Sequence, residues 1–348
     1  MKKNNEILSV MKGIAIMVVV MVHCLCPGEF FNFTSYFNLP IFYFAIGYFF
    51  KESYLQNPFD FVKRKFKGLY LTFVKWQLAF ILLHNVFAYF HICKSYYGIN
   101  EVARRCFSVL KFVQAELLLM PFWYIVSAFV CVFLYFIIRY IVNLADEKNR
   151  DYLMAFFMIV SFVIGIILKK VGFITIYYIE SSFILILILY FGEMFKKHEK
   201  QIPVNVYIAS GCFLCLCLLT YFSGISIVSA DFWDYWQFYL GVVAGIYLIY
   251  YISIQMLACG KLKKIFVTMG NESLYILGLH LLSFKIVDGL KILMYGDLTI
   301  DNLSDFTCVG AHHNIAFWLL YTIVGVSVPL VIKNLLDRLN VNVVKLLK

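Results

Sequence analysis

Long apolar stretches separated by short polar loops run along most of the chain. Ten stretches are long enough to cross, or nearly cross, about 30 Å of hydrocarbon. They lie at residues 7–26, 34–50, 69–90, 120–142, 152–168, 173–192, 204–222, 235–257, 272–290 and 314–333. The runs are continuous, whereas the strands of a membrane β-barrel alternate in hydrophobicity. The pattern therefore predicts an all-α integral membrane protein with about ten transmembrane helices.

The distribution of lysine and arginine indicates how these helices are oriented. With the N-terminus inside and ten crossings, 21 of these residues fall on the inner side and seven on the outer side. Positive residues collect in cytoplasmic loops. We therefore expect both termini in the cytoplasm. No internal repeat and no long polar linker interrupts the chain, so we expect one transmembrane domain over residues 1–348. The long outer connection, residues 91–119, is expected to carry an amphipathic helix near 108–120.

Composition agrees with a membrane protein. The chain is 63% hydrophobic and 14% charged, whereas soluble domains are about 45–50% apolar and about 25% charged. Loop topology accounts for the net charge of +10, so no nucleic-acid partner is expected. Most of the ten cysteines lie in apolar runs, where cysteine behaves as a small hydrophobe. Cys308, His312 and His313 lack a clear fourth ligand, so no metal is expected.

The first apolar segment, MKGIAIMVVVMVHCL, carries two ionisable residues, Lys12 and His23. Ionisable residues within a membrane span are costly and point to function. Eleven residues of helix make three turns plus about 20°, so both side chains share one face, about 16 Å apart along the axis. One face thus offers a cation near the cytoplasm and a base deep in the membrane. An elongated anion with a reactive tip, such as acetyl-CoA, fits this spacing.

This segment resembles the opening motif of acyltransferase family three, whose membrane enzymes O-acetylate bacterial surface polysaccharides. In that motif a basic residue is followed, after ten positions, by a histidine. Further similar pieces follow in the family's order: LPIFYFAIGYFF (39–50), VKRKFKGLYL (62–71), PFWYIVSAF (121–129), YFGEMFKK (190–197) and MGNESLYILGLH (269–280). Together they cover residues 7–333. Lys12 stands where arginine is usual, and Arg64-x-x-Lys67 replaces an Arg-x-x-Arg pattern, so the charge is kept without the second guanidinium fork.

The resemblance implies an O-acyltransferase of the bacterial inner membrane. It would move an acetyl group from acetyl-CoA to a hydroxyl of a cell-surface or exported glycan, or of a lipid-linked sugar. Either direct transfer or an acyl-His intermediate fits, and a separate relay protein stays open. The candidate catalytic residues are His23, as general base, and His280. The candidate cofactor-binding residues are Lys12, Arg64 and Lys67, and the candidate substrate-binding residues are Glu116, Trp123 and Glu180.

Each candidate also has a structural explanation. A histidine can bond a neighbouring helix, Arg64 and Lys67 can be topology markers, and Trp123 can belong to an interfacial aromatic belt. A membrane transporter or flippase of a glycan or lipid intermediate is the rival function. Such proteins more often show inverted repeats or broken helices at matched positions, and neither is visible in the sequence. A purely structural membrane scaffold is the third possibility.

Overall fold

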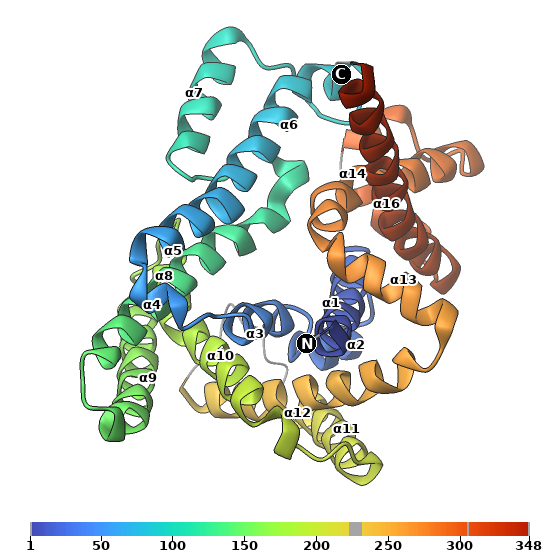
Figure 1. Ribbon diagram of the computed structural model, residues 1–348. Coiled ribbons are helices and arrows are strands. Elements are labelled where there is room, and N and C mark those ends of the chain that lie inside the picture. Colours follow the sequence, from blue (N-terminus) through green and yellow to red (C-terminus); the bar gives the residue numbers. More distant parts are fainter. Residues whose placement is uncertain (1, 223–231, 305, 347–348) are drawn as a thin grey trace.

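The computed structural model describes residues 2–222, 232–304 and 306–346, and every regular element in these ranges is helical (Figure 1). The long helices are α1 (Lys2–His23), α6 (Leu71–Tyr89), α8 (Trp123–Asn143), α9 (Glu147–Lys170), α10 (Ile179–His198), α11 (Val206–Phe222), α12 (Phe232–Leu257), α14 (Ser273–Met294) and α16 (Ile315–Leu346). The shorter α-helices are α2 (Gly28–Ser35), α3 (Pro40–Tyr48), α4 (Ser53–Gln56), α5 (Pro58–Lys65), α7 (Ile99–Leu110), α13 (Gly260–Asn271) and α15 (Thr307–Gly310). A π-helical turn η1 (Phe66–Tyr70) and the 3₁₀ segments η2 (Leu117–Phe122), η3 (Glu199–Gln201) and η4 (Ile300–Ser304) complete the set. The predicted all-α class is confirmed.

Six helical segments in the described ranges are long and apolar enough to cross a membrane. They are Glu6–His23, Pro58–Tyr89, Leu117–Asn143, Glu147–Lys170, Tyr235–Leu257 and Ile315–Leu339. The predicted second segment, residues 34–50, is not one helix. It is split between α2 and α3, and α3 begins at Pro40 and has nine residues, a rise of only about 14 Å. The count of ten and the cytoplasmic termini stay predictions.

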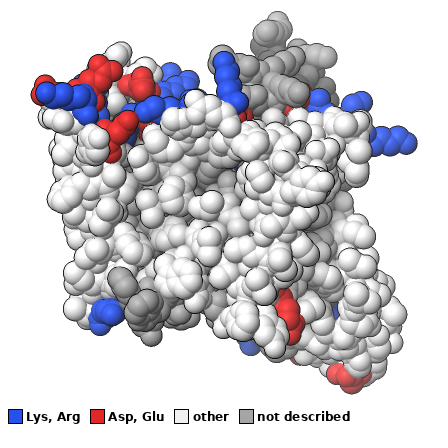
Figure 2. Space-filling view, turned by 90° about the horizontal axis from the view of Figure 1, so that it is seen from below, with Lys and Arg blue, Asp and Glu red and all other residues white. Residues whose placement is uncertain are grey.

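The charged residues on the face drawn in Figure 2 lie toward two opposite ends of the molecule. A broad band without Lys, Arg, Asp or Glu separates them (Figure 2). Many large apolar side chains on the outward surface of the helices are exposed, among them Leu82, Phe156 and Ile323. Such a band is expected where lipid, and not water, surrounds the helices.

Helix α1 lies near the middle of the bundle (Figure 1) and contacts α3, α12, α13, α14 and α16. Val10 and Met11 pack into an apolar cluster with α3, α8, α10 and α12. Ile16 and Val20 pack into a second cluster with α6, α14 and α16. A helix surrounded by neighbours is apolar all round. This explains why α1 reads as a continuous apolar run, in which polar residues stand out.

Glycines set the crossing of α1 with α13. A Cβ atom at Gly270 would lie 1.7 Å from the carbonyl oxygen of Ser9, and one at Gly13 would lie 2.2 Å from that of Phe266. Small residues allow such close contact between membrane helices. The Ser9 hydroxyl also donates to Asn271 Oδ1 over 2.8 Å. Because α14 begins two residues after α13 ends, this crossing fixes where α14 runs beside α1.

The predicted amphipathic helix near residues 108–120 is wrong in position. The helix in this connection is α7, which ends at Leu110. Phe112 adopts a left-handed conformation with φ of 63°, and the Val113 N–H donates to the Ser108 carbonyl over 3.0 Å. This i to i−5 bond past a left-handed residue is the Schellman termination of a helix. The chain after it is therefore free to form a loop, and this loop carries Glu116.

Candidate active site

His23 and His280 meet where the end of α1 faces α14. Nδ1 of His23 lies 3.2 Å from Nε2 of His280. Nδ1 of His280 lies 3.0 Å from the carbonyl oxygens of both Ile276 and Leu277, one helical turn earlier. Carbonyl oxygens only accept, so Nδ1 of His280 carries the hydrogen and its neutral ring accepts at Nε2. His23 must therefore donate from Nδ1, which leaves the lone pair of its Nε2 available as a base.

His23 lines a cavity of about 180 Å³ at the end of α1. The polar side chains in its wall, besides the histidine, are Ser35, Asn38 and Trp123. The rest of the wall is apolar and comes from α1, α2, η2, α14 and Leu39 in the connection between α2 and α3. His280 stands behind His23 and is fully buried. His23 is thus a base in the wall of a cavity, and the buried His280 ring orients it through a hydrogen bond.

Lys12 lines a second cavity, of about 390 Å³. Lys65, Thr72 and Ser273 are further polar residues in its wall, and the remainder is mostly apolar. The exposed residues Phe49 and Gly68 also line it, so the cavity reaches the surface between α3 and the π-turn η1. π-Helical turns inside helices are frequent at functional sites.

The two cavities adjoin each other. Val19, Leu39 and Leu277 line both, so these three apolar side chains lie where the two cavities meet. Lys12 lines the wider of these adjoining cavities, and His23, with His280 behind it, lines the narrower one. The face of α1 that the sequence spacing singled out is the face that borders both cavities.

Arg64 and Lys67 lie elsewhere. Both are exposed, and neither is among the residues that line the Lys12 cavity. Lys65, which follows Arg64 directly, is half-buried and does line this cavity. In the sequence, Lys63, Arg64 and Lys65 look equally suited to bind an anion. Helix α5 passes into the π-turn η1 directly after Lys65. A π-turn shifts the helical register, so the sequence did not show which lysine faces the cavity.

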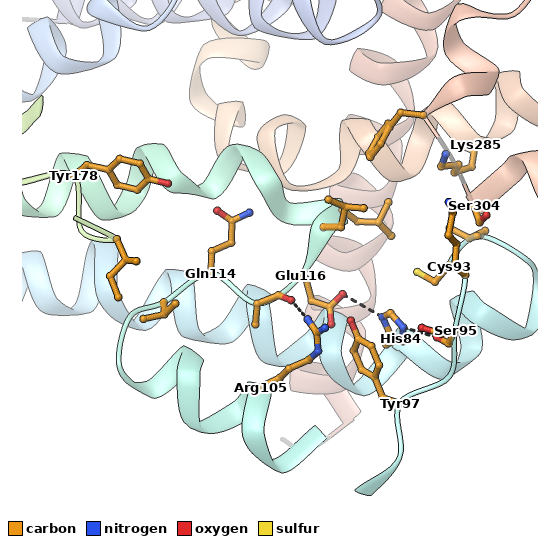
Figure 3. A pocket seen from close by; sticks show the side chains of 18 residues that line it. His84, Cys93, Ser95, Tyr97, Arg105, Gln114, Glu116, Tyr178, Lys285 and Ser304 are labelled. Atoms are coloured by element: carbon orange, nitrogen blue, oxygen red, sulfur yellow. Dashed lines mark hydrogen bonds and ion pairs between the residues drawn. The ribbon is translucent and has the colours of Figure 1, made fainter. Parts of the chain in front are cut away.

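Glu116 lies in a third cavity, of about 690 Å³, drawn in Figure 3. Its Oε2 is 3.2 Å from Nδ1 of His84, while Nε2 of His84 donates to the Ser95 carbonyl over 2.9 Å. With its Nε2 hydrogen committed to Ser95, the histidine can bond Glu116 only if one further proton lies between them. Burial raises the pKa of the Glu116 carboxyl, and the adjacent His84 opposes that rise. Glu116 and His84 thus form a buried pair that shares a proton.

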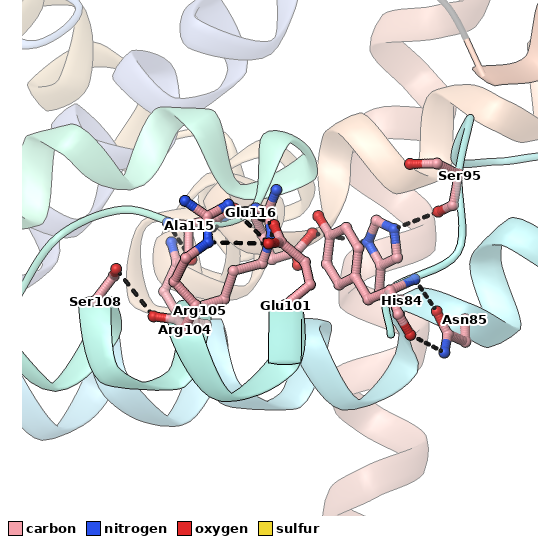
Figure 4. A network of polar contacts seen from close by, with 11 residues as sticks. His84, Asn85, Ser95, Glu101, Arg104, Arg105, Ser108, Ala115 and Glu116 are labelled. Atoms are coloured by element: carbon pink, nitrogen blue, oxygen red, sulfur yellow. Dashed lines mark hydrogen bonds and ion pairs between the residues drawn. The ribbon is translucent and has the colours of Figure 1, made fainter. Parts of the chain in front are cut away.

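Polar contacts hold the Glu116 loop in place (Figure 4). The backbone N–H groups of Ala115 and Glu116 donate to Gln77 Oε1 over 3.2 and 3.1 Å. Arg105 donates to the Ala115 carbonyl and also bonds Glu101 over 2.6 Å. In sequence, His84 and Gln77 were visible only as single polar residues in an apolar run, so their partners could not be inferred.

Trp123 and Glu180 occupy different surroundings. Trp123 lines the His23 cavity, and its ring contacts Tyr178 with centroids 5.4 Å apart. Glu180 is buried, and its Oε2 accepts from both the backbone and the hydroxyl of Thr175 over 3.2 and 3.0 Å. It lines none of the three cavities. Glu180, in the first turn of α10, thus ties the start of this helix to Thr175 in the preceding turn.

Comparison with known proteins adds the family. The model of acyltransferase family 3, an acyltransferase domain, matches residues 5–333. The chain belongs to acyltransferase family 3. This family 3 protein is therefore a membrane acyltransferase, and its cavities are candidate sites for an acyl donor and an acceptor. No curated protein and no solved structure matches the chain.

Proposed function

We propose that this family 3 acyltransferase moves an acetyl group from acetyl-CoA to a hydroxyl of a cell-surface or exported glycan, in the inner membrane of a bacterium. One observation supports the proposal: a cavity with Lys12 in its wall adjoins, at three shared apolar side chains, a cavity lined by His23. A lysine in the wall of one cavity, apolar side chains at the junction and a histidine in the wall of the other suit a thioester with an anionic end.

The donor is proposed to enter with its phosphates near Lys12 and Lys65, which both line the wider cavity. Arg64 and Lys67 are exposed close by in sequence and attract the anionic coenzyme toward this opening. The uncharged pantetheine arm then passes Val19, Leu39 and Leu277. This places the thioester at the level of His23, about 16 Å along α1 from Lys12.

At His23, Nε2 takes the proton from the acceptor hydroxyl as its oxygen attacks the thioester carbonyl carbon. The carbon–sulfur bond breaks when the tetrahedral intermediate collapses, and the coenzyme leaves as a thiolate. The protonated His23 returns the proton to that sulfur. His280 acts as a positioning residue, because its Nε2 accepts from His23 Nδ1 and so keeps the hydrogen on Nδ1 and the lone pair on Nε2.

The acceptor is proposed to approach from the side of η2. The end of η2 and the residue after it, Pro121 and Trp123, line the His23 cavity, whereas Leu117 and Leu118 at its start line the Glu116 cavity. A glycan could thus present one sugar to His23 beside the Trp123 ring and another to Glu116. Carboxylates and aromatic rings are suited to hold hydroxyl-bearing rings of this kind.

Membranes that contain the protein, supplied with labelled acetyl-CoA, test the proposal. We expect alkali-labile label on glycan, and a loss of about 100-fold or more in His23→Ala. His198→Ala, which removes an exposed histidine at the far end of α10, serves as the matched control and should label normally. Equal labelling by His23→Ala and wild type would exclude the role of the base. Reconstitution of the purified protein distinguishes direct transfer from a relay protein.

A further inference from the structure

The reaction proposed above forms a negatively charged oxygen on the thioester carbonyl, and such an oxygen requires N–H or O–H donors. The wall of the His23 cavity has four polar side chains: His23, Ser35, Asn38 and Trp123. His23 is already assigned as the base. The Ser35 hydroxyl donates to the Phe31 carbonyl over 2.7 Å, so its only proton is in use.

Asn38 differs from Ser35, because its donor group has no acceptor in the protein. Its Oδ1 accepts from the Leu39 backbone N–H over 2.6 Å, which fixes the orientation of the amide and places the NH₂ group at the other end. The side chain is 6% exposed. Among the described residues, no acceptor pairs with this NH₂ group. Because Asn38 lines the His23 cavity, this NH₂ group is open to the cavity, where an acceptor atom of a ligand can complete it.

The backbone around Asn38 is also fixed before any ligand binds. Asn38 lies in the tight connection between α2 and α3, and its N–H donates to the Thr34 carbonyl over 2.9 Å. Pro40 directly follows Leu39 and begins α3, and proline fixes its own φ angle. A donor held by its own backbone needs no rearrangement when charge develops in the transition state.

We propose that Asn38 Nδ2 donates a hydrogen bond to the thioester oxygen and is an oxyanion-binding residue of this site. The assignment rests on the proposed acyl transfer. The acceptor oxygen bonds to the carbonyl carbon of the thioester, and its proton goes to His23 Nε2. At the same time the carbonyl π-electrons move onto the thioester oxygen, which faces Asn38. The electrons return when the carbon–sulfur bond breaks, and the leaving thiolate then takes that proton.

Asn38→Asp tests the assignment, because aspartate keeps an oxygen for the Leu39 N–H and loses the NH₂ donor. Asn38→Ala, which introduces no charge, is the second variant, and Ser35→Ala is the control from the same wall. Purified variants are supplied with labelled acetyl-CoA and acceptor membranes, and each rate is divided by the amount of acetyl-CoA bound at saturation. Misfolded protein is thereby excluded from the comparison.

Both Asn38 variants should lose about 10²- to 10³-fold in kcat, with an unchanged KM for acetyl-CoA. Ser35→Ala should stay within about twofold of wild type, since a serine bond to its own helix contributes little. Full activity in either Asn38 variant would overturn the oxyanion assignment while the acyl transfer still stands. An increase in KM alone would also overturn it, because it would show ordinary donor binding. If wild type transfers no acetyl group, the proposed function itself fails.

Discussion

Replacing His280 by leucine removes the acceptor that orients His23. The hydrogen bond between the two rings is 3.2 Å long, and His280 is fully buried. Leaving a buried donor unpaired costs about 1–3 kcal/mol, which corresponds to about 5- to 150-fold in rate. Because the bond is long and joins two neutral rings, we expect the lower part of this range, a loss of about tenfold in kcat. The KM for acetyl-CoA should not change, since His280 lines neither donor cavity.

A conservative variant separates positioning from packing. In His280→Gln the side-chain oxygen can still accept from His23 Nδ1, so most of the activity should return, whereas His280→Leu stays impaired. The assay is steady-state acetyl transfer from labelled acetyl-CoA in purified, reconstituted protein, with kcat and KM determined separately. Thermal unfolding of each variant checks that the bundle is intact. Equal loss in the leucine and glutamine variants, or a loss confined to KM, would refute the tautomer argument.

Three further predictions concern the proposed passage between the cavities, the helix crossing and the Glu116 cavity. Leu277→Trp should obstruct the passage and raise the KM for acetyl-CoA by about tenfold or more, whereas Leu82→Trp, on the exposed surface of α6, should not. Gly270→Ala should lower the free energy of unfolding by about 3 kcal/mol, because its Cβ would lie 1.7 Å from a backbone oxygen of α1. Gly28→Ala is the control, since a Cβ there meets open space. Equal melting temperatures of the two variants would contradict this prediction. The raised pKa of Glu116 means that the folded state holds its proton more tightly than the unfolded chain. Its contribution to stability is therefore complete below its ordinary pKa of 4.5 and is lost as the pH rises through the raised value. The melting temperature of wild type minus that of Glu116→Gln should accordingly fall with rising pH, and a flat difference would contradict the assignment.

The sequence predicted much of the fold because hydrophobicity alone decides which segments enter a membrane. The all-helical class and the segments around α1, α6, α8, α9, α12, α14 and α16 follow from long apolar runs. The prediction of one helix over residues 34–50 was wrong. The helix is interrupted before Pro40, which begins α3, although the apolar composition is similar on both sides. Helix α7 was misplaced because Phe112, a residue with no preference for positive φ, terminates it.

The candidate site could be predicted only where spacing along one helix decides the geometry. Lys12 and His23 share a face of α1 whatever surrounds it, and each lines one of the two adjoining cavities. The contact of His23 with His280 depends on the glycine crossing of α1 with α13, which joins residues far apart in the chain. Asn38 looked like an ordinary loop residue. The Leu39 N–H orients the Asn38 amide, and the cavity leaves its NH₂ group open. No local sequence pattern shows either feature.

The central claim is that Lys12 and His23 hold opposite ends of one acyl donor. Equilibrium binding of acetyl-CoA and of S-acetylpantetheine, which lacks the phosphates and the nucleoside, tests it most directly. In Lys12→Met the affinity for acetyl-CoA should fall by about 10- to 100-fold, the value of a hydrogen-bonded charge pair, while the affinity for S-acetylpantetheine should stay as in wild type. His23→Ala should leave both affinities nearly unchanged. If Lys12→Met weakened both ligands equally, or neither, the two residues would not hold the two ends of one donor.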